Sequence, residues 1–366
     1  MPDLLDDIVG QDRQKEILNK IYNSKRIPNA FLFSGPEGVG KFYTAVRYIA
    51  LLNHNKNETI RNKILHLEEP YVQIIFPLPR GRGETPKDSP TEKLSKDILE
   101  EISNELSIKS KNPYYQISLN NANNIKISSI REIKRKVSFN YDEINFRGII
   151  INEAHKMSAE AQNALLKSLE EPPGGVIFFL LSASENMLLD TIKSRCWKVE
   201  FNPLNENEIV KILTTYFNVD ESTAQKVAPF GNGSAWYSKT LLDNGFTELL
   251  NEVIILLRYS LAKRYFTAIN KFESILNLND NITFKVVIEL ILKWLDDILK
   301  DRNNIKNLYF TQHVETIKKF NSKFASANVY QVYTDLEKLS GSFDQNISLN
   351  IIIMNTIFKL ATLTNG

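Results

Sequence analysis

The sequence predicts an α/β fold built on a parallel sheet, followed by an all-helical part. Short apolar runs alternate with segments whose apolar residues repeat every three or four positions, which is typical of strands separated by helices. The first strand is followed by a glycine-rich turn and then a helix, the order found in phosphate-binding loops. After Pro203 only helical patterns remain. Helices on both faces of a parallel sheet are therefore expected in the first part.

Length and composition are those of an ordinary globular protein. The 366 residues exceed the size at which a single core usually keeps growing, so two or three domains are expected. With 43% hydrophobic and 24% charged residues, a disorder-dominated chain is excluded. The formal net charge of +2 is too small to indicate nucleic-acid binding over the whole surface, although it is compatible with a local basic patch.

Cysteine usage and the first residues indicate a cytoplasmic location. Cys196 is the single cysteine, which excludes an internal disulfide and a multi-cysteine zinc site and fits a reducing compartment. The acidic start, Met1 to Asp7, lacks the basic and apolar regions of a secretion signal. No stretch approaches the roughly 18 uninterrupted apolar residues of a membrane helix. We therefore expect a soluble cytoplasmic protein without membrane contact.

Five strands are expected in the first part, each a short apolar run bounded by turn residues. They cover residues 30–34, 114–119, 147–151, 176–181 and 196–201. The helices expected around them cover residues 8–26, 43–53, 91–106, 127–138 and a segment that follows Ser158, a capping residue, and ends at Pro172. Residues 77–113 begin with a proline-rich stretch, and we expect them to form a partly irregular surface insertion.

The remainder is expected to be helical. Helices over residues 205–217 and 221–229 precede a glycine-rich turn and suggest a small lid. Apolar repeats over residues 253–265, 284–299 and 347–360 suggest a separate all-helical domain, with no heptad register long enough for a coiled coil. The expected domains are residues 1–203 (α/β, with the insertion at about 77–113), 204–246 (helical lid) and 247–366 (all-α).

The glycine-rich turn has the form of an altered phosphate-binding loop. Backbone N–H groups of such a turn point at phosphates while its lysine neutralises them. The residues that could still do so are Gly35, Gly38, Gly40 and Lys41. Phe42 stands where the motif places the hydroxyl that ligates magnesium. Passive binding of ATP or ADP and a simple tight turn are both compatible with this segment.

A second magnesium contact is also altered. The apolar run that ends at Ile151 leads into Asn152 and Glu153, where a magnesium-holding strand end would carry an aspartate. An amide lacks the negative charge that holds the metal. Glu153 occupies the place of a base that could polarise water, but a base without a positioned metal is a weak catalyst. A solvent-facing carboxylate with no part in hydrolysis is the favoured interpretation of Glu153.

Four separated blocks of sequence together resemble the clamp-loader branch of the AAA+ proteins. They are Ile8 to Gln11, Ile27 to Pro36, Asn163 to Pro173, and Ser194-Arg195-Cys196. The likeness covers most of residues 1–240 and is weakest in the C-terminal third, where only the helical character agrees. The resemblance implies an α/β P-loop AAA+ domain with a helical lid and a C-terminal all-α domain of the collar type. The altered loop is similar to that of the delta-prime type of bacterial DNA polymerase III clamp-loader subunit, a stator that does not hydrolyse ATP.

The resemblance assigns a role to Arg195. In that family the Ser-Arg-Cys motif places an arginine at the subunit boundary, where it reaches the ATP held by a neighbour. A fixed guanidinium beside the transferred phosphoryl group accelerates hydrolysis on the order of a thousandfold in GTPases. The alternative is an arginine at a strand entrance that pairs with a carboxylate.

Two departures from the family's patterns bear on cofactors. Gly233 to Trp236 resembles the lid motif in which active members carry a nucleotide-sensing arginine, and Trp236 takes that arginine's place. Many relatives carry a four-cysteine zinc module, which this chain lacks, so no zinc and no other metal is expected. No cofactor is required.

Contacts with DNA are expected, if anywhere, on the helix over residues 127–138. Arg131, Lys134 and Arg135 share a face opposite Ile130 and Ile133. In clamp loaders such contacts would go to backbone phosphates. A solvated charged face is an equally good interpretation, because Glu132 interrupts the patch.

The sequence thus favours a non-hydrolysing subunit of a sliding-clamp loader in DNA replication. The implied partners are other clamp-loader subunits, of the delta and tau/gamma types, and primed DNA within the complex, with the sliding clamp left open. One alternative is an active AAA+ ATPase subunit of the tau/gamma type, which would have to tolerate Phe42, Asn152 and Trp236. Another is a stand-alone DNA-binding protein descended from the fold.

Overall fold

The computed structural model describes residues 4–137, 143–277, 283–342 and 348–364. They form two compact units, Met1–Tyr237 and Ser238–Gly366. The division falls within one helix, Ala235–Asp243. We describe each unit by itself.

A five-stranded sheet forms the centre of the first unit. Its strands are β1 (Ala30–Ser34), β2 (Val72–Ile75), β3 (Arg147–Ile151), β4 (Val176–Ser182) and β5 (Trp197–Glu200). The strand order is β2-β3-β4-β1-β5, and every neighbouring pair is parallel. β1, which precedes the glycine loop, therefore lies between β4 and the edge strand β5.

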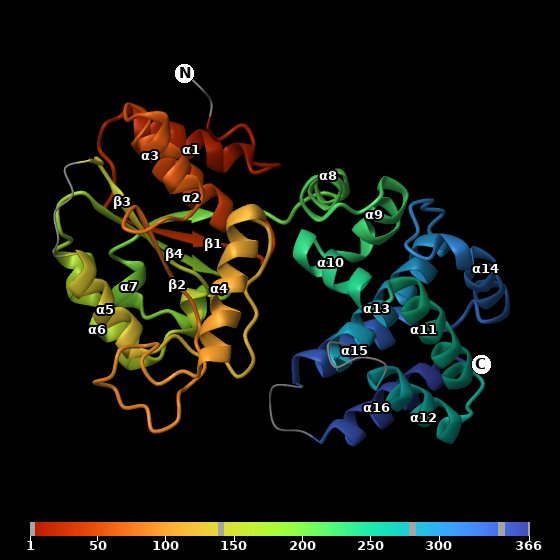
Figure 1. The fold of residues 1–366 in the computed structure, drawn as a ribbon. Coiled ribbons are helices and arrows are strands. Elements are labelled where there is room, and N and C mark those ends of the chain that lie inside the picture. Colours follow the sequence, from red (N-terminus) through yellow and green to blue (C-terminus); the bar gives the residue numbers. More distant parts are fainter. Residues whose placement is uncertain (1–3, 138–142, 278–282, 343–347, 365–366) are drawn as a thin grey trace. The chain divides into compact units, whose positions relative to one another are not determined.

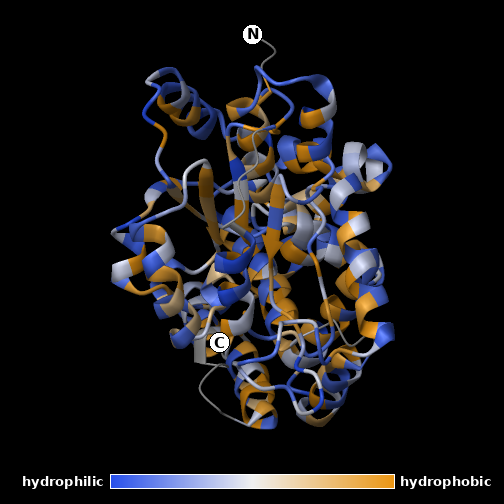
Figure 2. Cartoon of the chain, turned by 60° about the vertical axis from the view of Figure 1, so that its left-hand side comes forward, coloured by the Kyte–Doolittle hydropathy of each residue, from blue (hydrophilic) through white to orange (hydrophobic). Residues whose placement is uncertain are grey.

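The strands are apolar because the sheet is covered on both faces. Every residue of β1, β3 and β4 is buried, and the strand arrows in Figure 2 carry long orange, hydrophobic stretches. β5 differs, since only Val199 is buried in it, as suits an edge strand. In Figure 1, α1, α2 and α3 lie on one side of the sheet and α5, α6 and α7 on the other.

The helices of this α/β part mostly follow the expected segments. They are α1 (Asp12–Asn23), α2 (Lys41–Leu52), α3 (Glu58–Leu65), α4 (Lys96–Lys111), α5 (Ile127–Val137), α6 (Ala159–Glu170) and α7 (Asp190–Lys193), with short 3₁₀ turns at Ala154–Lys156 and Glu185–Met187. The Ser158 hydroxyl caps α6 by accepting from the Ala161 N–H at 3.2 Å, as predicted. The predicted end of the α5 segment, Ser138, lies outside the described residues.

One predicted strand is wrong, and one strand was not predicted. Residues 114–119 form no strand, because their polar groups bond to α4: the Tyr115 hydroxyl donates to Glu105 at 2.8 Å and the Ser118 N–H does so at 2.8 Å. The strand beside β3 is β2 instead, only four residues long and enclosed by prolines. The insertion helix, expected over residues 91–106, is α4 and begins five residues later.

The lid helices follow the sheet. They are α8 (Glu206–Phe217), α9 (Glu221–Val227), a 3₁₀ turn (Ala228–Phe230) and α10 (Ala235–Asp243). α8 begins with a capping box, in which the Asn205 side chain accepts from the Glu208 N–H and the Glu208 carboxylate accepts from the Asn205 N–H.

Described residues of the second unit are helical apart from turns and connecting segments. Its further elements are α11 (Phe246–Leu261), α12 (Tyr265–Leu276), α13 (Phe284–Arg302), a 3₁₀ turn (Thr311–His313), α14 (Val314–Lys323), α15 (Val329–Ser342) and α16 (Leu349–Thr362). The segment expected as one helix over residues 253–265 ends at Leu261, and Tyr265 begins the next helix after a turn in which Lys263 has a φ of 59°. Ile347, the predicted start of the last helix, lies outside the described residues.

The fold class predicted from the sequence is confirmed. The chain has an α/β domain with a parallel sheet and a glycine loop after β1, followed by lid helices and a helical C-terminal unit. Among the described residues, no helix is both long enough and apolar enough to cross a membrane.

Candidate functional site

The glycine loop lies directly against the lid. Gly35, Gly38 and Gly40 have φ values of 140°, 69° and 97°, which side chains rarely adopt. A Cβ atom at Gly38 would lie 2.5 Å from the Ser234 Oγ and 2.8 Å from the Trp236 Cβ. Only glycine permits this approach, so the residue at the lid's arginine position packs on the loop that would cradle phosphates.

The loop lysine is engaged by its own loop. The Lys41 side chain is buried, and its ammonium donates to the Gly35 carbonyl at 2.6 Å and to the Pro36 carbonyl. Burial lowers the pKa of Lys41 to about 8, although the Glu37 carboxylate acts in the opposite direction. In this arrangement the ammonium neutralises carbonyl dipoles of the turn, where an outer phosphate would otherwise be its partner.

The start of α2 packs against the insertion helix. Phe42 is buried, and the Lys109 ammonium lies 4.1 Å from the centroid of its ring. Lys109 also donates to the Pro113 carbonyl at 2.9 Å and to the Tyr115 carbonyl. The hydroxyl of Thr44, two residues after Phe42, donates to the Gly40 carbonyl at 2.9 Å. Phe42 has no hydroxyl, and the Thr44 hydroxyl is bonded to the backbone of its own helix, so neither of these two residues replaces the hydroxyl that ligates magnesium in the motif.

Aromatic rings join this region to the lid. Tyr114 packs on Tyr216 with ring centroids 4.9 Å apart, and a Cβ atom at Gly40 would lie 3.3 Å from the Tyr114 ring. Tyr115 meets Trp236 edge to face at 5.3 Å. The segment wrongly predicted as a strand therefore supplies the aromatic residues that hold the loop and the lid together.

The end of β3 carries Asn152 and Glu153, as expected from the sequence. Asn152 is buried and its N–H donates to the Ile75 carbonyl at 2.8 Å. Glu153 has a φ of 54°, and its carboxylate pairs with Lys156 at 2.6 Å. The Glu153 charge is thus partly neutralised from within the chain.

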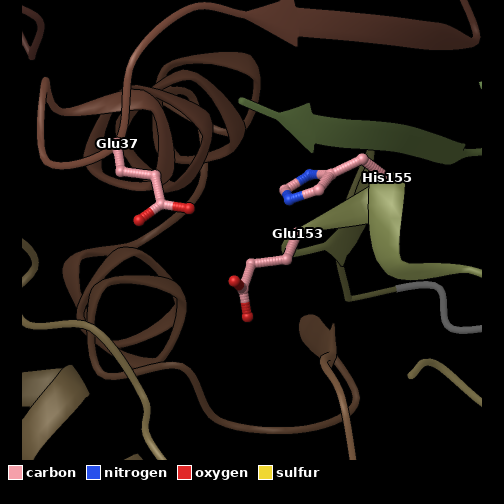
Figure 3. A group of neighbouring side chains, drawn as sticks. All are labelled: Glu37, Glu153 and His155. Atoms are coloured by element: carbon pink, nitrogen blue, oxygen red, sulfur yellow. The ribbon is translucent and has the colours of Figure 1, made fainter. Parts of the chain in front are cut away.

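Sequence reasoning missed one group of side chains at this place. Ligand atoms of Glu37, Glu153 and His155 all lie within 4.8 Å of one another, and in Figure 3 the three side chains surround a common space. Burial lowers the pKa of His155, against the opposing effects of both glutamates. Such a group could hold a cation, but Lys156 and Lys41 already compensate the carboxylates, and the absence of metal stays a prediction. The sequence feature that could have indicated this group is Glu37 within the glycine loop, together with Glu153 and His155 directly after the apolar run that ends at Ile151.

Arg195 lies at the other edge of the sheet. It sits between α7 and β5, and its Nε and Nη2 atoms donate to Glu170 at 2.9 and 2.6 Å. Its Nη1 donates to the Thr191 carbonyl at 2.9 Å. The carboxylate partner of the alternative interpretation is therefore present. Burial raises the pKa of the neighbouring Cys196 to about 12, so this thiol is a poor nucleophile.

The basic face of α5 is exposed. Ile130 and Ile133 are fully buried, while Arg131, Lys134 and Arg135 all point to solvent on the opposite side, as predicted. The Arg131 guanidinium donates to the Pro86 carbonyl of the insertion at 3.0 Å. Arg135 approaches Glu132 at 3.6 Å.

The fold and this site define an α/β protein in which a glycine loop follows the first strand of a parallel sheet and lies against a helical lid. The chain belongs to the family described as DNA polymerase III, delta subunit, whose model matches residues 10–205. It is thus a member of a clamp-loader family.

Two relatives found by sequence similarity are subunits of DNA polymerase III. The chain is 27% identical over 251 residues to the DNA polymerase III subunit tau of Bacillus subtilis, a stretch that covers 67% of this chain and 38% of that protein. It is 24% identical to the subunit gamma of Buchnera aphidicola subsp. Schizaphis graminum, over 96% and 95% of the two chains. A gamma subunit-related protein of Thermotoga maritima matches in structure with a TM-score of 0.43 and 17% identity, over 96% and 99% of the chains.

Replacing Phe42 tests whether this position is structural. We expect Phe42→Ser to lose about 3 kcal/mol of folding free energy or more, because it empties buried space and removes the ring under Lys109. Phe42→Leu, which keeps most of the apolar volume, is the matched control and should lose less than half as much. Urea denaturation of both variants measures the difference. Equal stability of the two variants would contradict a packing role.

The buried Lys109 predicts a pH dependence of stability. Burial lowers the pKa of Lys109 from its ordinary value near 10.5 to about 7 in the folded chain. Between these values the unfolded chain binds more protons, so stability rises with pH. Relative to Lys109→Met, the wild type should gain about 2 kcal/mol between pH 7 and pH 8.5. Urea denaturation at both pH values checks this, and parallel pH profiles of the two proteins would refute it.

Proposed function

We propose that the chain is a non-hydrolysing, delta-prime-type subunit of the DNA polymerase III clamp loader. Its partners would be subunits of the delta and tau/gamma types, with primed DNA bound inside the assembly. The observation that supports this best is the contrast between two sites. In the chain's own phosphate loop Lys41 is bound to two backbone carbonyls and Trp236 lies close to Gly38, whereas Arg195 lies exposed at the opposite end of the sheet.

The residues of the loop do not fit a magnesium–nucleotide complex. Phe42 and Asn152 replace the two groups that hold the ion, and Lys41 already has two carbonyl partners. Binding of ATP or ADP without magnesium would require Lys41 to leave its carbonyls and Trp236 to leave Gly38. We therefore propose that the isolated chain turns over no ATP and that any nucleotide it takes up is a passive ligand.

Sheet geometry gives the reason why Arg195 would act on a neighbour. β1 and β5 are parallel, with Phe31 beside Trp197 and Ser34 beside Glu200. The glycine loop follows the carboxyl end of β1, whereas Arg195 precedes the amino end of β5. The length of β1 separates them by roughly 15 Å, so the guanidinium cannot serve the chain's own loop. An exposed arginine at a subunit boundary can instead stabilise the charge that develops on a neighbour's phosphoryl group.

The alternative of an active ATPase subunit has one observation in its favour. The relatives found by sequence similarity include tau and gamma subunits of DNA polymerase III. This alternative requires that an active ATPase tolerate Phe42, Asn152 and Trp236 in place of its two magnesium contacts and its nucleotide-sensing arginine. Magnesium-dependent ATP turnover by the purified chain would establish this alternative and exclude ours, and tight, salt-sensitive duplex binding by the isolated chain would favour the stand-alone DNA-binding protein.

Substitution of Arg195 tests its proposed action on the ATP of a neighbouring subunit. In a loader rebuilt with Arg195→Ala, turnover at the neighbouring ATP site should fall on the order of a thousandfold, so the complex loses that site's share of DNA-stimulated phosphate release. Arg26→Ala, which removes an exposed arginine elsewhere in the unit, is the control and should leave turnover unchanged. Wild-type turnover and clamp loading with Arg195→Ala would refute the assignment.

The basic face of α5 is proposed to contact DNA backbone phosphates within the loader. Lys134→Ala combined with Arg135→Ala should weaken binding of the loader to primed DNA for all sequences alike and lower the slope of log K against log salt by about 2. The control, Lys318→Ala with Lys319→Ala, removes two exposed positive charges from α14. The slope is obtained from binding constants measured by fluorescence anisotropy at salt concentrations of about 50 to 300 mM. An unchanged slope in the α5 variant would leave these residues as a solvated face.

A further inference from the structure

The surroundings of Arg195 fix its guanidinium from two separate elements. Glu170, the last residue of α6, accepts from Nε at 2.9 Å and from Nη2 at 2.6 Å through the same oxygen, Oε1. The Thr191 carbonyl, on α7, accepts from Nη1 at 2.9 Å. The Ser194 hydroxyl lies 3.4 Å from Nη1. A side chain with four rotatable bonds is therefore held in one orientation.

The elements that carry these acceptors are themselves well placed. α6 ends at Glu170, and two prolines follow within three residues, which prevents the helix from continuing. α7 is closed by the Ser194 N–H, which donates to the Asp190 carbonyl at 2.9 Å. Ile192 of α7 and Leu169 of α6 lie in the same buried core. The two acceptors thus sit on elements whose relative position the core determines.

The position of Glu170 on the guanidinium decides whether the carboxylate orients Arg195 or blocks its access to a phosphate. Nε and one N–H of Nη2 face the carboxylate, so the second N–H of Nη2 stays available to an incoming oxygen. A carboxylate that blocked the finger would be expected on both terminal nitrogens. The side chain of Arg195 is 35% exposed, which leaves it accessible from outside the chain.

We infer that Glu170 is the positioning residue of Arg195: it holds the guanidinium in its outward orientation before a neighbouring subunit arrives. This inference rests on the proposed action of Arg195 in trans. A flexible arginine loses side-chain freedom when it engages a phosphate, and a preorganised one has already lost it. Because the pair is exposed, its contribution to folding stability is small, and its effect should fall on turnover at the neighbouring site.

Substitutions of Glu170 in the assembled loader test the inference. Glu170→Ala should lower DNA-stimulated ATP turnover about three- to tenfold, because the guanidinium becomes mobile. Glu170→Gln keeps an oxygen that accepts from Nε and should retain most of the activity. The control is Glu171→Ala, which removes the adjacent exposed carboxylate and should have no effect. The double variant Glu170→Ala/Arg195→Ala should be no slower than Arg195→Ala alone.

Three results would overturn the positioning role of Glu170. They are unchanged turnover with Glu170→Ala, faster turnover with Glu170→Ala, which would mean that the carboxylate blocks Arg195, and a loss in the double variant that adds to the loss of Arg195→Ala.

A second readout separates this inference from the proposed function. In the purified chain, the Nε–H of Arg195 should give an NMR signal protected from exchange in wild type and Glu170→Gln and lost in Glu170→Ala. If that signal is protected but Arg195→Ala leaves loader turnover unchanged, the role in trans fails while the positioning contact stands. If it is unprotected in the wild type, the positioning inference fails whatever the ATPase shows.

Discussion

The parallel pairing of β1 with β4 and β5 is the constraint on which the rest of the site depends. It places the glycine loop at the carboxyl edge of the sheet and Arg195 at the amino edge, with the length of β1 between them. Parallel strands need crossover connections, and these bring α6 and α7 to the amino edge, where Glu170 and Thr191 meet the arginine. One topological fact therefore separates the glycine loop from Arg195 by the length of a strand, so that the two cannot meet within one chain.

The glycine loop shows how a nucleotide pocket can become part of the core. Removing a hydroxyl at position 42 does not by itself close the pocket, since the glycines and Lys41 remain. Closure comes from other contacts: Lys41 bonds to the turn, Trp236 packs on Gly38, and Tyr114 packs beside Gly40. Phe42 supplies a ring to the buried Lys109, whose charge would otherwise be costly at that depth. The Lys41 ammonium is the group that would neutralise a phosphate, so its bonds to the turn and nucleotide binding compete for the same atom.

The sequence predicted what depends on short-range patterns. β1, β3 and β4 are continuous apolar runs, and Ser158 caps α6 as its position before the helix indicates. The failure at residues 114–119 has a physical cause. Two adjacent tyrosines followed by Ile117 and Leu119 suit a strand, yet the Tyr114 and Tyr115 rings pack instead on Tyr216 and Trp236 of the lid. β2 was missed because four residues between prolines carry little periodic signal. Within the site, position-specific residues such as Phe42 and Arg195 could be found from motif spacing.

Partners across the fold could not be found in that way. The Glu170–Arg195 pair joins residues 25 apart in sequence, and the Lys109–Phe42 contact joins the insertion to the loop helix. Nothing in the local pattern of either segment specifies the other, since the contact depends on how crossovers place the helix ends. The sequence could therefore offer the finger and the ion pair only as alternatives. In the structure the two alternatives are compatible: the Glu170 carboxylate on Nε and Nη2 orients the guanidinium, and the second N–H of Nη2 is left for another oxygen.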